Sequence, residues 1–423
     1  MNLSLQLSEV RTSSAVSISG SKSETNRLLL LQALYPNIEL DNISTSDDSE
    51  VMMNAIKTSD TIIDIHHAGT AMRFLTAYFA MEVGREVLLT GSPRMKERPI
   101  GILVEALQQL GADISYEEKI GFPPLRIIGK KITNNKVAIQ ADVSSQYISA
   151  LLLIAPKLEN GLQLTLEGEL TSVPYIQMTL NLLNQIGAKT KFNDNKIEVF
   201  PIADSQKPAT RNLQRTTHNL QRTIVNVESD WSSASYFYSI IALSKVGTQI
   251  TLSSFTQDSI QGDSTLVEIY RNFGVETTFN DHNITLRKNN LQPTTYDGQL
   301  NNTPDLAQTI AVTCFGLRIG CQLTGLHTLK IKETDRLAAL QNELTKLGAR
   351  VAISEDSLTL EPAKAIKSNA IVETYNDHRM AMAFAPLALI VPIIINEAEV
   401  VSKSYPNFWK DINNIGFQIE TTR

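Results

Sequence analysis

The sequence predicts an α/β protein, α+β in layout, with two domains built from about six βαβαββ units, three per domain. Two recurring patterns and the chain length support this prediction. One pattern is a helix that ends at a glycine and leads into a strand, and the other is a polar loop that opens an apolar helix. The chain has 423 residues, which exceeds what one hydrophobic core usually holds, so two domains are expected.

The helix–glycine–strand junction consists of an apolar-periodic helix, a bulky apolar residue, a glycine, another apolar residue and a β-branched run. Glycine adopts the left-handed conformation that ends a helix and turns the chain into a strand. The junctions lie at Gly111, Gly187, Gly274, Gly348 and Gly416, with a degenerate copy lacking glycine near Ser59. Neighbouring junctions are too far apart for a solenoid repeat. Such junctions are common in α/β proteins, but their recurrence here favours true internal repetition.

Seven polar loops each open an apolar helix and place Ser, Thr, Asp, Asn or Gly at the expected cap. They begin the segments 20–34, 66–80, 142–155, 230–243, 303–315, 331–344 and 376–389. Helix N-termini carry unpaired N–H groups and partial positive charge, so they bind phosphate and carboxylate well. Several of these loops also contain Lys or Arg, which strengthens the prediction of anion binding.

Composition excludes several classes of protein. The net charge is −6 and the basic residues form no long run, which disfavours nucleic acid and anionic membranes as partners. The most apolar stretch, Met380 to Ile395, is interrupted by two prolines and is too short to span a membrane. The N-terminus resembles neither a signal nor a transit peptide, so a cytoplasmic location is expected.

The cysteines and histidines show no metal-binding pattern. Cys314 and Cys321 lie in apolar surroundings, where we expect small core residues in a reducing compartment. The six histidines lack ligand spacing, so no metal site is expected. A polar connector at 201–226 contains a near-tandem repeat, RNLQRT and HNLQRT, which suggests a surface hairpin extended by duplication.

Four charged motifs stand at predicted helix starts, and each is weak by itself because a solvated helix cap would look the same. They are GSKSETNR at 20–27, SPRMKERP at 92–99, IKETDR at 331–336 and NDHR at 376–379. Arg379 precedes an almost wholly apolar helix, where a ligand clamp is favoured over a solvated charge. No Walker loop, nucleophile elbow or dinucleotide fingerprint occurs. Cationic helix starts in both domains are what two small, highly anionic substrates would require.

The motifs resemble those of the 5-enolpyruvylshikimate-3-phosphate synthase family. The matching segments are GSKSxTNR at 20–27, AGTAMR at 68–73, GSPRMKERP at 91–99, SSQ at 144–146, SVPY at 172–175, PD at 304–305, KETDR at 332–336, NDHR at 376–379 and Lys403 in SKSYP. They occur in order along nearly the whole chain. The resemblance implies a two-domain inverse αβ barrel with three βαβαββ units around a pseudo-threefold axis in each domain. It also implies domains at 1–19 plus 227–423 and at 20–226, with an active site in the interdomain cleft.

The resemblance further implies roles for residues that match the motifs. Catalysis would fall to Lys22, Asp305 and Glu333, with Asp305 accepting the proton of the 5-hydroxyl. Shikimate 3-phosphate would be bound by Lys22, Ser23, Arg27, Ser144, Ser145, Gln146, Ser172, Tyr175, Asp305, Thr328 and Lys332. Phosphoenolpyruvate would be bound by Lys22, Gly69, Thr70, Arg98, Gln146, Arg336, Arg379 and Lys403. His67 and His378 are further candidates, and Arg73 is expected to shape its loop.

The chemistry accounts for this inventory without the family name. Each substrate carries a phosphate and a carboxylate, together roughly −5 to −6, which the cations would neutralise. Adding an alcohol to an enol ether needs a general base and a general acid, and elimination reverses the pair. No cofactor or metal is required, and a monomer is expected.

Three features depart from the family pattern. His66-His67 replaces the usual Gly-Asn, and Thr328 stands where many members have Asn. The third departure is the duplication within 211–223. The retained Gly69 suggests inhibition by glyphosate that competes with phosphoenolpyruvate.

Three alternatives remain. The sister transferase acting on UDP-N-acetylglucosamine normally has a loop cysteine, which the first half of this chain lacks. An RNA-terminal-phosphate cyclase would need a nucleotide and an adenylated histidine, and the acidic balance disfavours RNA. A non-catalytic phosphosugar-binding homologue would not need Lys22, Asp305 and Glu333 together.

Overall fold

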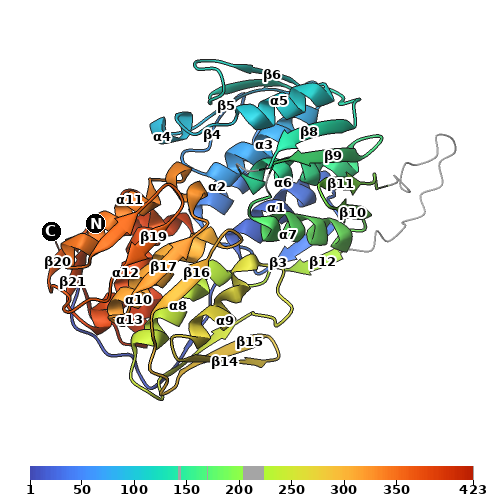
Figure 1. Cartoon of the computed structure of the whole chain (residues 1–423). Coiled ribbons are helices and arrows are strands. Elements are labelled where there is room, and N and C mark those ends of the chain that lie inside the picture. The colour runs from blue at the N-terminus through green and yellow to red at the C-terminus, as the bar shows by residue number, and fades with distance from the viewer. Residues whose placement is uncertain (142–143, 169, 203–222, 423) are drawn as a thin grey trace. The chain divides into compact units, whose positions relative to one another are not determined.

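The computed structural model describes residues 1–141, 144–168, 170–202 and 223–422. The chain divides into two compact units (Figure 1). Unit 1 comprises Met1–Lys22, Ser44–Asp48 and Glu228–Arg423, and unit 2 comprises Ser23–Ile43 and Ser49–Val227. Most of the predicted hairpin in the connector falls on residues 203–222, outside the described ranges. The short segment Ser44–Asp48 belongs to unit 1, which the sequence-based boundaries do not anticipate.

Five four-stranded sheets with one shared layout organise the described residues. In each sheet one edge strand is parallel to its neighbour, and the other two pairings are antiparallel. Unit 2 contains β4(Ile62–Asp64)-β5(Glu86–Thr90)-β7(Leu125–Ile128)-β6(Asp113–Tyr116) and β8(Lys136–Gln140)-β9(Leu162–Glu167)-β11(Lys196–Val199)-β10(Thr190–Asn193). It also contains a parallel pair, β12(Thr223–Asn226)-β3(Ile38–Asp41).

Unit 1 contains the other three four-stranded sheets. They are β14(Val275–Asn280)-β15(Asn283–Lys288)-β13(Gln249–Ser253)-β2(Ser13–Val16), β16(Tyr296–Gln299)-β17(Cys321–Thr324)-β19(Leu358–Leu360)-β18(Val351–Ile353) and β20(Ala370–Val372)-β21(Ile393–Ile395)-β1(Asn2–Leu5)-β22(Ile419–Thr422). In the last sheet, the N-terminal strand β1 lies between two C-terminal strands and is antiparallel to both. The prediction of a mixed α/β fold is therefore confirmed at the level of sheets and helices.

The predicted glycine junctions follow helices, as expected. Gly111 and Gly348 both have φ of 103°, and Gly187 has φ of 95°. They follow the helices α5(Gly101–Leu110), α11(Arg336–Lys346) and α7(Val173–Gln185), respectively. A side chain at these positions would strain the backbone, so the sequence signal has a direct conformational cause.

Apolar helices form the core of each unit. In unit 1, α8(Trp231–Leu243), α10(Ala307–Gly316) and α12(His378–Phe384) contact one another. In unit 2, α6(Ser145–Ile154) packs against α3(Gly69–Met81) and α7. Cys314 and Cys321 are buried and unbridged in unit 1, in agreement with the predicted core role.

The described residues contain neither a helix that could span a membrane nor a cluster that could bind a metal. No helix there has both the length and the apolar character needed to cross a membrane. No three His, Cys, Asp or Glu side chains in the same ranges lie close enough together to hold a metal ion.

Candidate active site

Unit 1 gathers charged residues at the ends of helical segments. Asp305 lies in η3(Pro304–Leu306), and Arg336 is the first residue of α11. His378 and Arg379 are the first two residues of α12, and Lys403 ends η6(Ala398–Lys403). Asp335 and Asp377 cap α11 and α12, and Pro304 opens η3. Arg336, His378 and Asp305 therefore lie in first turns, where backbone N–H groups are unpaired.

Arg336 is the centre of this cluster, which we call the unit 1 charge cluster. Its side chain is only 2 % exposed. Nε contacts Asp377 Oδ2 at 2.6 Å, Nη1 contacts Asp305 Oδ1 at 2.8 Å, and Nη2 contacts Glu333 Oε2 at 2.8 Å. Burial opposes its charge, but the three carboxylates outweigh burial and raise the pKa of Arg336 above its usual value.

Asp305 is surrounded by cations. Arg379 Nη2 lies 3.2 Å from Asp305 Oδ2, and Lys332 Nζ lies 3.4 Å from Asp305 Oδ1. Burial alone would raise the pKa of Asp305, yet Arg379, Lys332 and Arg336 together hold it well below its usual range. The carboxylate is therefore ionised and able to accept a proton, and its basicity will rise wherever another anion engages these cations.

Lys22, Glu333 and Lys403 belong to the same cluster. Lys403 Nζ lies 3.3 Å from Glu333 Oε1, and its side chain is 5 % exposed. Lys22 Nζ lies 3.1 Å from Asp48 Oδ2. Burial, together with the charges of Lys22, Arg379 and Lys403, lowers the pKa of His378 well below its usual range, so its imidazole is neutral. The structure thus brings the three predicted catalytic residues into one electrostatic environment.

Unit 2 contains a second group of predicted residues around the N-terminus of α3. The guanidinium of Arg98 lies against Gly69: a Cβ on that glycine would stand 2.6 Å from Arg98 Nη1. Thr70 is the second residue of α3 and accepts a hydrogen bond from Gln146 Nε2 at 3.2 Å. The buried Nε of Arg98 has no hydrogen-bond partner among the described residues. The pairing of a helix N-terminus with a guanidinium is suited to a phosphate.

Arg73 joins the two loops that carry these residues. It donates to the carbonyl of Gly69 at 3.2 Å and to the carbonyl of Pro99 at 2.9 Å. Tyr147 Oη donates to the same Pro99 carbonyl at 2.6 Å. These bonds agree with the expectation that Arg73 shapes its loop.

Arg27 lies at the meeting point of four helices of unit 2. From α1(Lys22–Leu34) it donates to Thr179, Ser149 and the carbonyl of Ser23 at 2.8, 3.1 and 2.7 Å. Its guanidinium carbon lies 5.4 Å from the centroid of the Phe74 ring. Burial lowers the pKa of Arg27 to about 10, so it is charged at neutral pH. The predicted contact with a substrate carboxylate stays a prediction.

The predicted serines lie at helix starts in unit 2. Ser144 is the N-cap of α6 and accepts from the backbone N–H of Gln146 at 3.3 Å, and Ser145 is the first residue of that helix. Ser172 precedes α7 with φ of 55°, and Tyr175 lies in the first turn. The ring centroid of Tyr175 lies 6.0 Å from the Arg27 guanidinium carbon.

Two predicted residues lie less clearly within these groups. Thr328 lies in η4(His327–Ile331) of unit 1, and its buried Oγ1 has no hydrogen-bond partner among the described residues. His67 is exposed in the turn before α3. Their roles stay predictions.

Sequence reasoning missed Asp48 and Asp377. Asp377 is fully buried, caps α12 by accepting from the Arg379 N–H at 2.9 Å, and holds Arg336. Asp377 lies inside the NDHR motif at 376–379, but only His378 and Arg379 of that motif were predicted to have functional roles. Asp48 is 3 % exposed and pairs with Lys22. In the sequence, its only distinguishing feature is that Asp47 and Asp48 stand together at the start of a helical segment.

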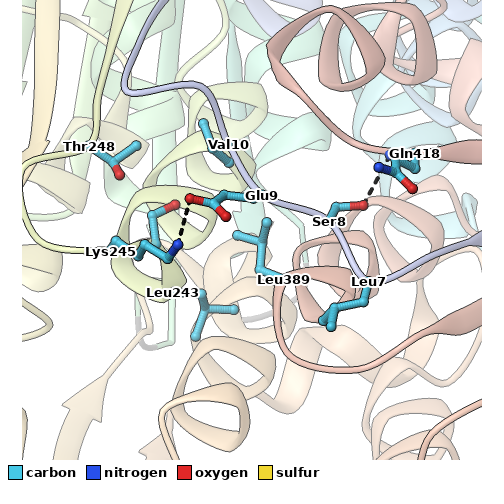
Figure 2. Close-up of a pocket in the computed structure, with 10 residues that line it drawn as sticks. Leu7, Ser8, Glu9, Val10, Leu243, Lys245, Thr248, Leu389 and Gln418 are labelled. Carbon is cyan, nitrogen blue, oxygen red and sulfur yellow. Dashed lines mark hydrogen bonds and ion pairs between the residues drawn. The ribbon is translucent and has the colours of Figure 1, made fainter.

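A cavity of about 450 Å³ lies elsewhere in unit 1, and none of the predicted site residues lines it. Figure 2 shows Lys245 paired with Glu9, and the backbone N–H of Gln418 donating to Ser8 Oγ, at the lining of this cavity.

Comparison with known proteins identifies the family. The family model described as EPSP synthase (3-phosphoshikimate 1-carboxyvinyltransferase) matches residues 54–412. A protein of that enzyme name from Bacteroides fragilis is 44% identical over 410 residues, covering 96% of each chain. Another, from Colwellia psychrerythraea, is 36% identical and covers 94% of this chain and 95% of its own.

Solved structures show the same fold at low sequence identity. An EPSP synthase from Acinetobacter baumannii is 20% identical with a TM-score of 0.77, and the match covers 100% of both chains. The enolpyruvyl transferase NikO from Streptomyces tendae is 13% identical with a TM-score of 0.71, covering 100% of this chain and 99% of its own. By its sequence motifs, its family-model match and these relatives, the chain belongs to the EPSP synthase family.

Proposed function

We propose that this chain transfers the enolpyruvyl group of phosphoenolpyruvate to the 5-hydroxyl of shikimate 3-phosphate and releases phosphate. The names of its relatives support this activity. The observation that carries the proposal is the unit 1 charge cluster, where Asp305 and Glu333 lie among Lys332, Arg336 and Lys403. The two carboxylates can transfer protons, and the cations beside them can bind anions. An addition–elimination reaction on anionic substrates needs both kinds of group.

Arg336 and Arg379 would bind the carboxylate of phosphoenolpyruvate. Both guanidinium groups now contact Asp305, so an incoming carboxylate would compete for the same donors. That competition would weaken the hold of the cations on Asp305 and raise its pKa. Asp305 would then become a stronger base in the complex, where it must accept the proton of the 5-hydroxyl.

Lys22 and Glu333 would move the proton at the methylene carbon. Addition of the alcohol requires a proton on that carbon, and elimination of phosphate removes one. Lys403 Nζ lies 3.3 Å from Glu333 Oε1, so the two side chains form an ion pair. Together with Lys22, Lys403 would also neutralise phosphate charge that builds up as the leaving group departs.

Residues of unit 2 would bind the phosphates and the ring of the second substrate. Arg98, Gln146, Gly69 and Thr70 are proposed to bind the phosphate of phosphoenolpyruvate. The proposed ligands of shikimate 3-phosphate are Ser23, Arg27, Ser144, Ser145, Ser172 and Tyr175, together with Thr328 and Lys332 of unit 1.

The recurrent sheet layout supports a finer proposal about the architecture. Each four-stranded sheet with its helices would be one copy of a βαβαββ unit, and the β3–β12 pair would belong to a sixth copy. The chain is proposed to act as a monomer.

The experiment that tests the function is phosphate release from phosphoenolpyruvate, measured with and without shikimate 3-phosphate. We expect release only when both substrates are present. Release with UDP-N-acetylglucosamine instead would favour the sister transferase. Binding of both substrates without release would favour a non-catalytic homologue.

Asp305→Asn tests the base assignment within the same assay. It keeps the side-chain shape but removes the proton acceptor, so turnover should fall by roughly 10²–10⁴-fold while phosphoenolpyruvate still binds. Asp297→Asn, an exposed change in β16 of the same unit, is the matched control and should retain full turnover. Full activity in Asp305→Asn would contradict the role of Asp305.

A further inference from the structure

A buried glutamate on α11 connects the unit 1 charge cluster to a strained turn. Glu343 is fully buried. Its carboxylate accepts from Tyr375 Oη at 2.6 Å, from the backbone N–H of Glu373 at 3.1 Å and from Lys346 Nζ at 2.8 Å. Lys346 belongs to α11 itself, so the other two donors, Tyr375 Oη and the Glu373 N–H, connect the segment 373–376 to α11.

The segment that Glu343 binds has an unusual backbone. Tyr375 and Asn376 are consecutive non-glycine residues with φ of 56° and 54°. Asparagine tolerates this left-handed conformation, but an aromatic residue there is unfavourable and persists only when its surroundings impose it. The short bond between Tyr375 Oη and Glu343 is a contact that can impose it.

The strained turn leads directly into the charge cluster. Asp377 follows Asn376, caps α12 through the Arg379 N–H, and contacts Arg336 through both carboxylate oxygens. Arg336 and Glu343 are seven residues apart on α11, about two turns, so they lie on the same helix face. Segment 373–379 is therefore attached to α11 through Glu343 and through Arg336. The two left-handed residues, Tyr375 and Asn376, lie where the segment passes from the first attachment to the second.

We infer that Tyr375 and Glu343 form a positioning pair that sets the turn at 375–376 and thereby aligns Asp377, Arg336 and Arg379 for binding a substrate carboxylate. Neither residue needs to touch substrate, because Glu343 lies roughly 10 Å along the helix from Arg336. Burial and the bond to Glu343 raise the pKa of Tyr375 to about 12, so its hydroxyl stays protonated and donates at neutral pH. The inference rests on the proposed roles of Arg336 and Arg379.

The test compares three replacements of Tyr375 by steady-state phosphate release, with the KM for each substrate and kcat determined separately. Tyr375→Phe and Tyr375→Ala lose the bond but keep a β-carbon, so the KM for phosphoenolpyruvate should rise roughly tenfold. The KM for shikimate 3-phosphate should stay within about twofold. Tyr375→Gly also loses the bond, but glycine adopts the left-handed conformation without strain, so it should recover much of the affinity lost in Tyr375→Ala.

Tyr238→Phe is the matched control, because it deletes a buried hydroxyl bonded to Thr277 at 3.0 Å in the same unit. It should lower thermal stability without changing either KM. The inference is overturned if Tyr375→Phe leaves the KM for phosphoenolpyruvate unchanged, or raises both KM values alike. It is also overturned if Tyr375→Gly binds no better than Tyr375→Ala, since a packing role would make glycine the worse replacement.

Arg336→Lys separates failure of this inference from failure of the proposed function. If Arg336→Lys leaves the KM for phosphoenolpyruvate unchanged, the proposed role of Arg336 fails and the inference fails with it. If Arg336→Lys raises that KM but Tyr375→Phe does not, the positioning role alone is wrong.

Discussion

At the scale of single residues, the close approach of the Arg98 guanidinium explains why position 69 is a glycine. A Cβ at Gly69 would lie 2.6 Å from Nη1 and 3.0 Å from Nη2 of Arg98. The first distance is shorter than real contacts and the second is tight, so any larger residue must displace the guanidinium. The absence of a side chain at this position therefore determines where the positive charge lies.

Gly69→Ala should raise the KM for phosphoenolpyruvate by roughly tenfold or more, because the guanidinium shifts from its position beside α3. The KM for shikimate 3-phosphate should change much less. Steady-state kinetics with each substrate varied in turn will measure both effects. Ser115→Ala, an exposed change in β6 of the same unit, controls for a general effect of alanine. Equal KM values in Gly69→Ala and the wild type would contradict this account.

Asp263 is a buried carboxylate near the charge cluster. It accepts from the Ser232 hydroxyl, and Ser232 Oγ in turn accepts from Arg379 Nη2 at 3.2 Å. Burial raises the pKa of Asp263 to about 6, although Arg379 opposes the shift. The ordinary pKa of an aspartate is 3.8, so the folded protein binds this proton more tightly than the unfolded chain does.

The contribution of Asp263 to stability should therefore be fully present below about pH 3.8 and lost as pH rises through about 6. The free energy of unfolding of the wild type, minus that of Asp263→Asn, should increase by about 1.4 kcal/mol per pH unit as pH falls from 6 to 4. Urea unfolding of both proteins at pH 7, 6, 5 and 4 measures this difference. A difference that is constant across the series would mean that Asp263 titrates normally.

At the scale of elements, aspartate caps orient the helices that carry the charge cluster. Asp335 Oδ1 accepts from the N–H groups of Leu337 and Ala338, each at 3.1 Å. Asp377 and Asp230 cap α12 and α8 in the same way. Because the cap fixes the first turn, it also fixes the direction in which the following arginine leaves the helix.

Asp335→Ala should lower the free energy of unfolding by about 1 kcal/mol and also weaken binding of phosphoenolpyruvate, since Arg336 follows directly. Asp335→Asn, which retains a capping oxygen, should behave nearly as the wild type. Denaturant unfolding and the KM for phosphoenolpyruvate report the two effects. If the Ala and Asn variants are equally impaired, the charge of Asp335 matters rather than its cap.

At the scale of whole units, the N-terminal strand completes a C-terminal sheet. Leu3 pairs with Ile395, and Leu5 pairs with Ile393 on one side and Ile419 on the other. Leu5 is fully buried. The first residues of the chain are thus a structural part of the unit that carries Lys403 and α12.

Leu5→Ala should destabilise unit 1 by about 2–5 kcal/mol, because it leaves a cavity beneath a central strand. Leu7→Ala, only two residues on but 57% exposed, should change stability by less than about 0.5 kcal/mol. Thermal unfolding of both variants tests the contrast. Similar unfolding curves for the two variants would show that β1 contributes little.

Local features of the sequence determined the elements and the candidate chemistry. The glycines at 111, 187 and 348 end helices because only glycine is unstrained there. The motifs at 331–336 and 376–379 placed Arg336 and Arg379 at helix starts, because capping is a property of neighbouring residues. These signals act within a few residues, so a sequence displays them directly.

Only the tertiary structure decided which of these groups meet. Asp377 holds Arg336 across 41 residues, and Asp48 pairs with Lys22 across 26. The burial of Arg27 by three other helices and the bond between Glu343 and Tyr375 are equally non-local. Such pairings depend on how elements pack, and many carboxylates in the sequence could have served each cation. The packing of elements selects among them, because a buried charge is stable only where a specific partner reaches it.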